Sequence, residues 1–407
     1  MMNKPLTIAM LSIHSCPLGQ LGGRDTGGMN VYIRELAGEL GRRGHSVDIY
    51  TKRHSVHHEQ IMNIGERVRL IHLDTEAEED TPKVAIYASL QNMLCGIENF
   101  RKSDMRQYDI IHSHYWLSGI MGAQLHMWWH IPHMVMFHTL GIPKNSSDAN
   151  NNEPELRIEK EKEVIRHSDR IIAATEVEKA SLISSYGASP SRVAVIPCGV
   201  NMNLFKPVDR EKARQHLNLT HKNIVLFVGR LEHLKGLRQL IKAMSLVNES
   251  ADTALIVVGG DEHSKGELLQ LQRLAQNLNV AERIYFIGSV EQDKLPTYYS
   301  AADVCIVPSY YESFGMVALE SLTCGTPVVA ADVGGMRQII RDEVMGYIVP
   351  TNEPALLADR ISLVLTQKKR AHDIVTRQSA VTEFSWSHIA QRILEEYEAI
   401  THTAAGP

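Results

Sequence analysis

The stretch IVLFVGRLEHLKG, residues 224–236, decides the fold of the second half of the chain. It passes from an apolar run into a glycine turn and then toward a helix, a pattern typical of a strand buried in a parallel sheet. Similar runs follow at 254–258, 283–287, 304–307, 327–331 and 347–349, separated by helical patterns that begin near Lys235, Gly266, Asp293, Phe314 and Pro354. This alternation predicts a doubly wound α/β domain.

The first half of the chain has the same rhythm. Its apolar runs lie at 7–14, 46–50, 68–73, 109–112, 134–138, 170–174 and 193–196, and Met29, Ile33, Leu36 and Leu40 mark a helix after the first of them. We therefore predict an α/β fold with two doubly wound, parallel-sheet Rossmann-like domains in tandem. Ligands of such sheets bind at the carboxyl ends of the strands, so we expect the site in a cleft between the domains.

We expect the hinge at residues 197–207, because this stretch contains two prolines and a glycine and has no hydrophobic periodicity. We expect a first domain over 1–199, a second over 200–383 and a C-terminal helix within 384–407. Trp386, Ile389, Ile393 and Tyr397 form one stripe of this helix, which either caps the second domain or crosses back to the first.

Composition excludes several classes of protein. The 407 residues are too many for one core, and 44% apolar with 22% charged residues is ordinary for a globular chain. A formal charge of −5 disfavours nucleic acid as a partner, and no apolar stretch is long enough for a membrane span. Five scattered cysteines without a CxxC pair indicate a reducing, cytoplasmic compartment. A homodimer through the tail or an edge strand stays open.

A glycine-rich loop, GQLGGRDTGGMN at 19–30, separates the first predicted strand from its helix. Glycines let the backbone approach a phosphate at a helix start, although the loop could also be a plain flexible connection. It is not the dinucleotide fingerprint, because GxGxxG is absent and no acidic residue ends the second strand. A nicotinamide dehydrogenase is therefore disfavoured.

Charged residues follow two strands of the second half. Arg230 and Lys235 suit a diphosphate leaving group, whereas Glu312 and Glu320 suit sugar or ribose hydroxyls beside the helix start at Gly315. The alternative for each is a solvated surface residue.

The motifs GGMNVY, IHSHYWLSG, FHTLGIPKN, FVGRLEHLKG and ESFGMVALE, followed by GTPVVAADVGG, resemble those of retaining glycosyltransferases of the GT-B fold, family 4. The resemblance runs from the first strand to the tail helix. The two glutamates eight residues apart, Glu312 and Glu320, are its most specific mark.

The resemblance implies a UDP-sugar as co-substrate. Glu320 would bind the ribose, Glu312 the transferred sugar, Arg230 and Lys235 the diphosphate, and His138 would lie by the donor sugar. The implied donor-binding residues are Gly27, Gly28, Arg230, Lys235, Glu312, Ser313, Phe314, Gly315 and Glu320, and the implied catalytic residues are Arg230, Lys235, His138 and Glu312.

The first domain is most similar to family members that use phosphorylated acceptors, inositol 3-phosphate or, more loosely, fructose 6-phosphate. The implied acceptor residues are His14 and Asn30 for the polyol, and the Gly28 amide, Lys83, Tyr115, Thr139 and Arg157 for the phosphate. A non-catalytic sugar-nucleotide-binding protein with the same fold is the alternative from another class.

Two departures concern the donor site and metals. GSVEQDKL, residues 288–295, stands where the resembled enzymes have a further arginine. No cofactor is required, and although the family allows a magnesium ion, we predict no metal site. The HSH spacing at 112–114 fits packed or hydrogen-bonded histidines better than metal ligands. With no strand-end carboxylate in the matching motifs of the first domain, we expect retention by same-face substitution rather than through a covalent intermediate.

Overall fold

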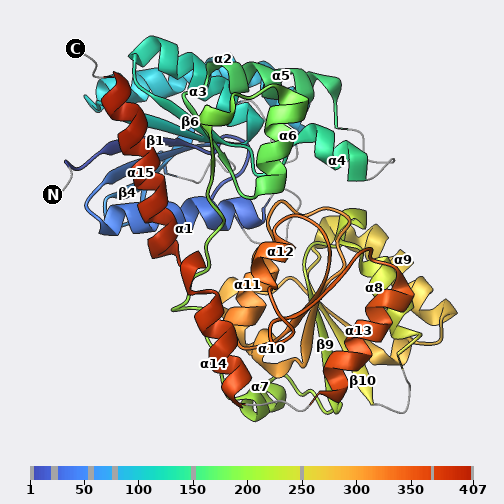
Figure 1. Ribbon diagram of the computed structural model, residues 1–407. Coiled ribbons are helices and arrows are strands. Elements are labelled where there is room, and N and C mark those ends of the chain that lie inside the picture. The colour runs from blue at the N-terminus through green and yellow to red at the C-terminus, as the bar shows by residue number, and fades with distance from the viewer. Residues whose placement is uncertain are drawn as a thin grey trace. The chain divides into compact units, whose positions relative to one another are not determined.

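The computed structural model describes residues 4–19, 26–53, 59–75, 81–147, 153–247, 252–367 and 371–404. Residues 20–25 of the glycine-rich loop lie outside them. The chain divides into two compact units (Figure 1). Unit 1 contains Gly28–Pro197 together with the N-terminal strand and Trp386–Pro407, and unit 2 contains Cys198–Ser385.

Unit 1 is built on an eight-stranded sheet of order β3-β4-β2-β1-β5-β6-β7-β8. Its strands are β1 (Thr7–Leu11), β2 (Ser46–Lys52), β3 (Ile61–Gly65), β4 (Val68–Leu73), β5 (Ile110–His114), β6 (His133–Met136), β7 (Arg170–Ala173) and β8 (Val193–Val195). All neighbouring strands are parallel except β3 and β4. The antiparallel edge strand β3 is a correction to the predicted all-parallel sheet. Its residues alternate between exposed and half-buried, so it lacks the apolar run that marks the other strands.

Helices cover both faces of this sheet. They are α1 (Gly28–Arg42), α2 (Lys83–Ser103), α3 (Tyr115–Trp129), α4 (Gly141–Ser147), α5 (Glu155–His167), α6 (Glu176–Tyr186) and α15 (Trp386–Ala404). The core under α2, α3 and α5 joins Ala9 and Leu11 of β1 to Leu90, Leu117 and Val164. Figure 1 shows α1 and α15 side by side, away from α2 and α3.

The C-terminal helix α15 belongs to unit 1. Its apolar stripe is buried as the spacing predicts, with Ile389, Ile393 and Tyr397 fully covered. Trp386 meets Tyr32 of α1 edge to face at 5.3 Å between ring centroids. The last helix of the sequence thereby completes the hydrophobic packing of the first unit.

Unit 2 is built on a six-stranded parallel sheet of order β11-β10-β9-β12-β13-β14. Its strands are β9 (Asn223–Val228), β10 (Thr253–Val258), β11 (Ile284–Gly288), β12 (Val304–Val307), β13 (Val328–Ala331) and β14 (Gly346–Val349). Its helices are α7 (Arg210–His216), α8 (Leu237–Met244), α9 (Lys265–Asn277), α10 (Leu295–Ala301), α11 (Met316–Thr323), α12 (Met336–Ile339), α13 (Pro354–Thr366) and α14 (Ala371–Ala380). The side chains of α8, α9 and α13 form one core with β9 and β10. The prediction of two doubly wound domains is confirmed.

Candidate active site

Each sheet reverses its winding once, and the candidate residues follow the strands at the reversals. In unit 1 the order turns back between β1 and β5, and in unit 2 between β9 and β12. Loops diverge at such a switch point, so it is the ligand crevice of an open α/β sheet. His14 and Tyr115 follow β1 and β5, while Arg230 and Glu312 follow β9 and β12.

In unit 1 the predicted acceptor residues converge on the ring of Tyr115. The His14 ring lies 4.3 Å from the Tyr115 ring between centroids. The Lys83 ammonium lies 5.6 Å and the Arg157 guanidinium 4.8 Å from the Tyr115 centroid. Cations near an aromatic face gain electrostatic energy, so the ring helps to hold two positive charges together. Four of the residues proposed from sequence are thus brought into one cluster.

His14 is neutral in this cluster. Burial lowers its pKa well below the usual value, and the charges of Lys83 and Arg157 lower it further. A neutral imidazole both donates and accepts a hydrogen bond, which is the capacity needed to bind a polyol hydroxyl.

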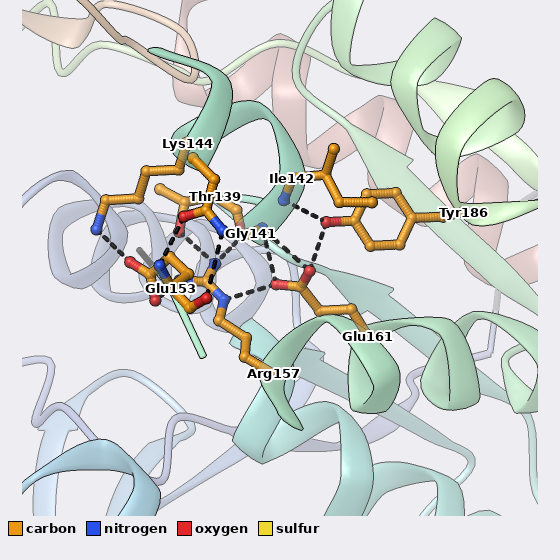
Figure 2. Close-up of polar contacts among 9 residues, drawn as sticks. Thr139, Gly141, Ile142, Lys144, Glu153, Arg157, Glu161 and Tyr186 are labelled. Carbon is orange, nitrogen blue, oxygen red and sulfur yellow. Dashed lines mark hydrogen bonds and ion pairs between the residues drawn. The ribbon is translucent and has the colours of Figure 1, made fainter. Parts of the chain in front are cut away.

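Arg157 is buried and already engaged (Figure 2). Its Nη2 donates to the Thr139 carbonyl at 2.7 Å and to Thr139 Oγ1 at 3.0 Å, and its Nε donates to Glu161 Oε1 at 2.7 Å. The side chain is therefore fixed by the protein, not held out into solvent as a free phosphate ligand. The structure brings Arg157 and Thr139, both predicted for the acceptor phosphate, into direct contact.

Asn30 is held by the backbone after β1. Its Nδ2 donates to Ser15 Oγ at 2.7 Å and to the Cys16 carbonyl at 2.6 Å. Both amide protons are used in these bonds, so Asn30 fixes the loop that carries His14.

The glycine pair predicted to approach the donor lies at the start of α1. Gly28 is the first residue of that helix, so its amide is among those left open by the helix geometry. Gly27 directly precedes it. Residues 20–25 of the glycine-rich loop fall outside the part of the chain that the structure describes.

Three histidines of unit 1, His112, His114 and His138, form a packed group. His114 Nδ1 and His138 Nε2 are 3.0 Å apart, and His112 Nδ1 is hydrogen-bonded to the Tyr397 hydroxyl of α15 at 2.7 Å. Burial lowers the pKa of His138 and of His112 to about 3, so both rings are neutral. His138 adopts a left-handed φ of 60°, which the hydrogen bond and its burial hold in place. Within the described ranges, no group of three or more His, Cys, Asp or Glu side chains could hold a metal ion.

In unit 2 Lys235 and Glu312 lie against each other. Lys235 Nζ donates to Glu312 Oε1 at 2.7 Å, and Ser309 Oγ donates to the same oxygen at 2.8 Å. Arg230 Nη2 is 2.9 Å from Glu232 Oε1. Lys235 and Glu312, the residues predicted for the diphosphate and the transferred sugar, are therefore joined after the ends of β9 and β12.

Two glycines shape these loops, and Gly236 allows their close approach. Gly236 has a φ of 69°, and a Cβ there would lie 1.9 Å from the Pro308 carbonyl oxygen. Gly315, with a φ of 115°, precedes α11, so the amides at the start of that helix are left for a ligand. The Tyr310 amide donates to the Leu234 carbonyl at 2.8 Å, which joins the two loops directly.

Glu320 is buried, with 7% of the residue exposed. Its Oε2 accepts a 2.7 Å hydrogen bond from the Tyr299 hydroxyl. Burial raises its pKa to about 7, although the hydrogen bond from Tyr299 works in the opposite direction. The sequence left open a solvated helix residue at this position, and the structure excludes that alternative.

The side chain of Phe314, one of the predicted donor-binding residues, is buried and packs on Phe384 at 5.9 Å between ring centroids. The Phe314 carbonyl accepts from the Gly335 amide. Phe314 therefore anchors the loop that leads into α11, and its place among the donor-binding residues stays a prediction.

Sequence reasoning missed Glu161 and the stacked pair His233 and Tyr310. Glu161 stands four residues after Arg157 on α5, a spacing that places two side chains on one helix face and could have revealed the pair. The rings of His233 and Tyr310 stack at 5.0 Å with an interplanar angle of 9°. No local pattern indicates that contact, because the residues belong to loops after different strands.

The two Rossmann-like units, each with polar residues at its switch point, define a glycosyltransferase of the GT-B class. The family Glycosyl transferases group 1 matches residues 209–380, and Glycosyltransferase Family 4 matches residues 26–204. A D-inositol 3-phosphate glycosyltransferase from Geodermatophilus obscurus is 36% identical over 98% of this chain and 91% of its own.

Solved structures agree with this class. The sucrose-phosphate synthase of Thermosynechococcus elongatus has a TM-score of 0.87 at 30% identity, covering 98% of this chain and 100% of that one. Anabaena HepE, solved in complex with UDP-glucose, has a TM-score of 0.76 at 20% identity over 97% of this chain and 100% of its own, and shows the same fold. The chain belongs to glycosyltransferase family 4 and is a glycosyltransferase. None of its described helices is long and apolar enough to cross a membrane.

Proposed function

We propose that the enzyme transfers a hexose or N-acetylhexosamine from a UDP-sugar to a phosphorylated polyol or sugar such as inositol 3-phosphate, with retention of configuration. The observation that carries the proposal is the convergence of Lys83 and Arg157 on Tyr115 beside neutral His14. Such a group combines cations for a phosphate with a hydrogen-bonding ring for a hydroxyl. The name of the Geodermatophilus relative supports this acceptor class.

The donor assignment rests on unit 2. Glu320 is positioned by Tyr299 to accept hydrogen bonds from ribose hydroxyls, and Arg230, Lys235 and the open amides after Gly315 would bind the diphosphate. Glu312 would bind the hydroxyls of the transferred sugar once Lys235 turns to the diphosphate. The UDP-glucose in the Anabaena structure supports a nucleotide sugar as the donor.

Same-face substitution fits the side chains after β1, β5 and β6. These are His14, Tyr115, His138 and Thr139, and none is a carboxylate that could form a glycosyl intermediate. The leaving diphosphate would take the proton of the acceptor hydroxyl, while Arg230 and Lys235 stabilise its developing charge. Neutral His138 would donate or accept a hydrogen bond to the transferred sugar without adding charge.

A second acceptor, fructose 6-phosphate, is favoured by the structural match to sucrose-phosphate synthase. A matrix of UDP-sugars against inositol 3-phosphate, fructose 6-phosphate and the free acceptors, analysed by product mass, separates the two. We expect product with a phosphorylated acceptor, and product only with free acceptors would refute the proposal.

We further propose that the reaction needs no metal or cofactor besides the co-substrate, and that it takes place in the cytoplasm. The five cysteines are free thiols, which suits a reducing compartment.

A further inference from the structure

The carboxylate of Glu153 lies between two cations of the acceptor region (Figure 2). Lys144 Nζ donates to Glu153 Oε1 at 2.5 Å, and Arg157 Nη1 lies 2.9 Å from Glu153 Oε2. Burial alone would raise the pKa of Glu153, but the charges of Arg157 and Lys144 bring it below its usual value. Glu153 is therefore an anion at neutral pH.

The backbone of Glu153 is fixed beside α4. Its amide donates to Asn145 Oδ1 at 2.6 Å, and Asn145 Nδ2 donates to its carbonyl at 3.3 Å. Lys144 is the neighbour of Asn145, so the same link holds the ammonium within reach of Arg157. The arrangement brings a second lysine, absent from the set expected from sequence, to the guanidinium that faces Tyr115.

The two carboxylates on Arg157 differ in how firmly they are held. Glu161 is fully buried and also accepts from the Gly141 amide at 3.0 Å and from the Tyr186 hydroxyl at 2.7 Å. The side chain of Glu153 keeps 14% exposure, and its contacts in the described part of the chain are the two cations alone. Displacing Glu161 from Arg157 would also break its hydrogen bonds from the Gly141 amide and the Tyr186 hydroxyl. Displacing Glu153 would break only its two ion pairs, with Lys144 and Arg157, among the contacts of the described residues.

We propose that the Glu153 carboxylate occupies the binding position of the acceptor's phosphate when no acceptor is bound. The incoming phosphate displaces this carboxylate and binds Lys144 in addition to Arg157. The inference rests on the proposed function, since it specifies how that site selects phosphorylated acceptors. A phosphate monoester carries about −1.5 to −2 charge at pH 7 and three acceptor oxygens, so it satisfies both cations better than one carboxylate. An uncharged acceptor cannot displace Glu153, which makes the residue a determinant of specificity.

The test compares Glu153→Gln with Glu163→Gln. The control removes a more exposed carboxylate that is paired with Lys160 on α5. Inorganic phosphate serves as the probe, measured as a competitive inhibitor against the phosphorylated acceptor. Without the competing charge, we expect the Ki of phosphate and the KM of the acceptor to fall about three- to tenfold in Glu153→Gln. We expect kcat and the donor KM to stay unchanged in that variant, and all four values to stay unchanged in the control.

Lys144→Gln provides the opposite change, and it keeps the test decisive if Glu153→Gln folds poorly. We expect it to raise the Ki of phosphate and the acceptor KM about three- to tenfold. If the wild type prefers the phosphorylated acceptor but neither variant moves these constants, the role of Glu153 and Lys144 is refuted and the proposed function stands. If the wild type uses free and phosphorylated acceptors equally, both proposals fail.

Discussion

Lys235 donates a 2.7 Å hydrogen bond to Glu312, although the two residues are 77 positions apart and follow different strands. The bond joins the residue proposed for the diphosphate to the residue proposed for the transferred sugar. Donor binding would exchange this internal ion pair for contacts with the phosphate and the sugar hydroxyls. In the proposed mechanism Lys235 would then lie beside the bond that breaks, where its charge would lower the barrier most.

Replacing Lys235 should therefore affect turnover more than acceptor binding. In Lys235→Ala we expect kcat to fall on the order of 10² to 10³-fold, the loss typical of one electrostatic donor to a leaving group. Steady-state kinetics with a labelled UDP-sugar measure it, with Lys242→Ala on α8 as the control. Near-normal turnover would refute the role of Lys235.

Much of the fold follows from the sequence, since the apolar runs locate most strands to within a few residues. The exception is β3, an exposed edge strand without an apolar run. For the candidate site, the sequence predicts which residue types follow the strands. It also predicts that they share one edge of the sheet, because parallel strands have their carboxyl ends on the same edge. Their internal pairing was not: Glu312 with Lys235, and Glu153 with Arg157 and Lys144, depend on loop conformations that no periodicity specifies.

Arg157→Ala should weaken both the phosphorylated acceptor and the protein. It removes the counter-ion of fully buried Glu161, which typically costs roughly 3–5 kcal/mol of unfolding free energy. In Arg157→Gln combined with Glu161→Gln we expect most of that stability to return, while the acceptor KM stays raised. Urea unfolding and acceptor kinetics measure the two effects, and a double variant with normal acceptor KM would contradict the phosphate role.

Glu320 should make stability depend on pH. Its pKa is about 7 in the folded protein and about 4.5 in the unfolded chain. Its contribution to the free energy of unfolding is therefore fully present below pH 4.5 and is lost as the pH rises to 7. Glu320→Gln has no carboxyl group to ionise at this position. Its free energy of unfolding, relative to that of the wild type, should therefore rise by about 3 kcal/mol between pH 4.5 and pH 7. Urea unfolding at several pH values measures the gain. Exposed Glu262→Gln should show no such trend, and a flat difference for Glu320→Gln would contradict the buried site.

Tyr397 connects the tail helix to the histidine group. Tyr397→Phe removes the hydrogen bond to His112 and leaves a buried ring nitrogen without its partner, at a cost of about 1–3 kcal/mol. Thermal unfolding measures the loss, with Tyr285→Phe, which removes the hydroxyl of an exposed tyrosine in unit 2, as the comparison. Unchanged stability in Tyr397→Phe would show that α15 does not fix the histidines.

The most direct test of the central claim is the ratio of kcat/KM for inositol 3-phosphate to that for free inositol, measured with one UDP-sugar. Two charge-assisted contacts to a phosphate predict a ratio of at least about 10². A ratio near one, with measurable transfer to both acceptors, would contradict the account.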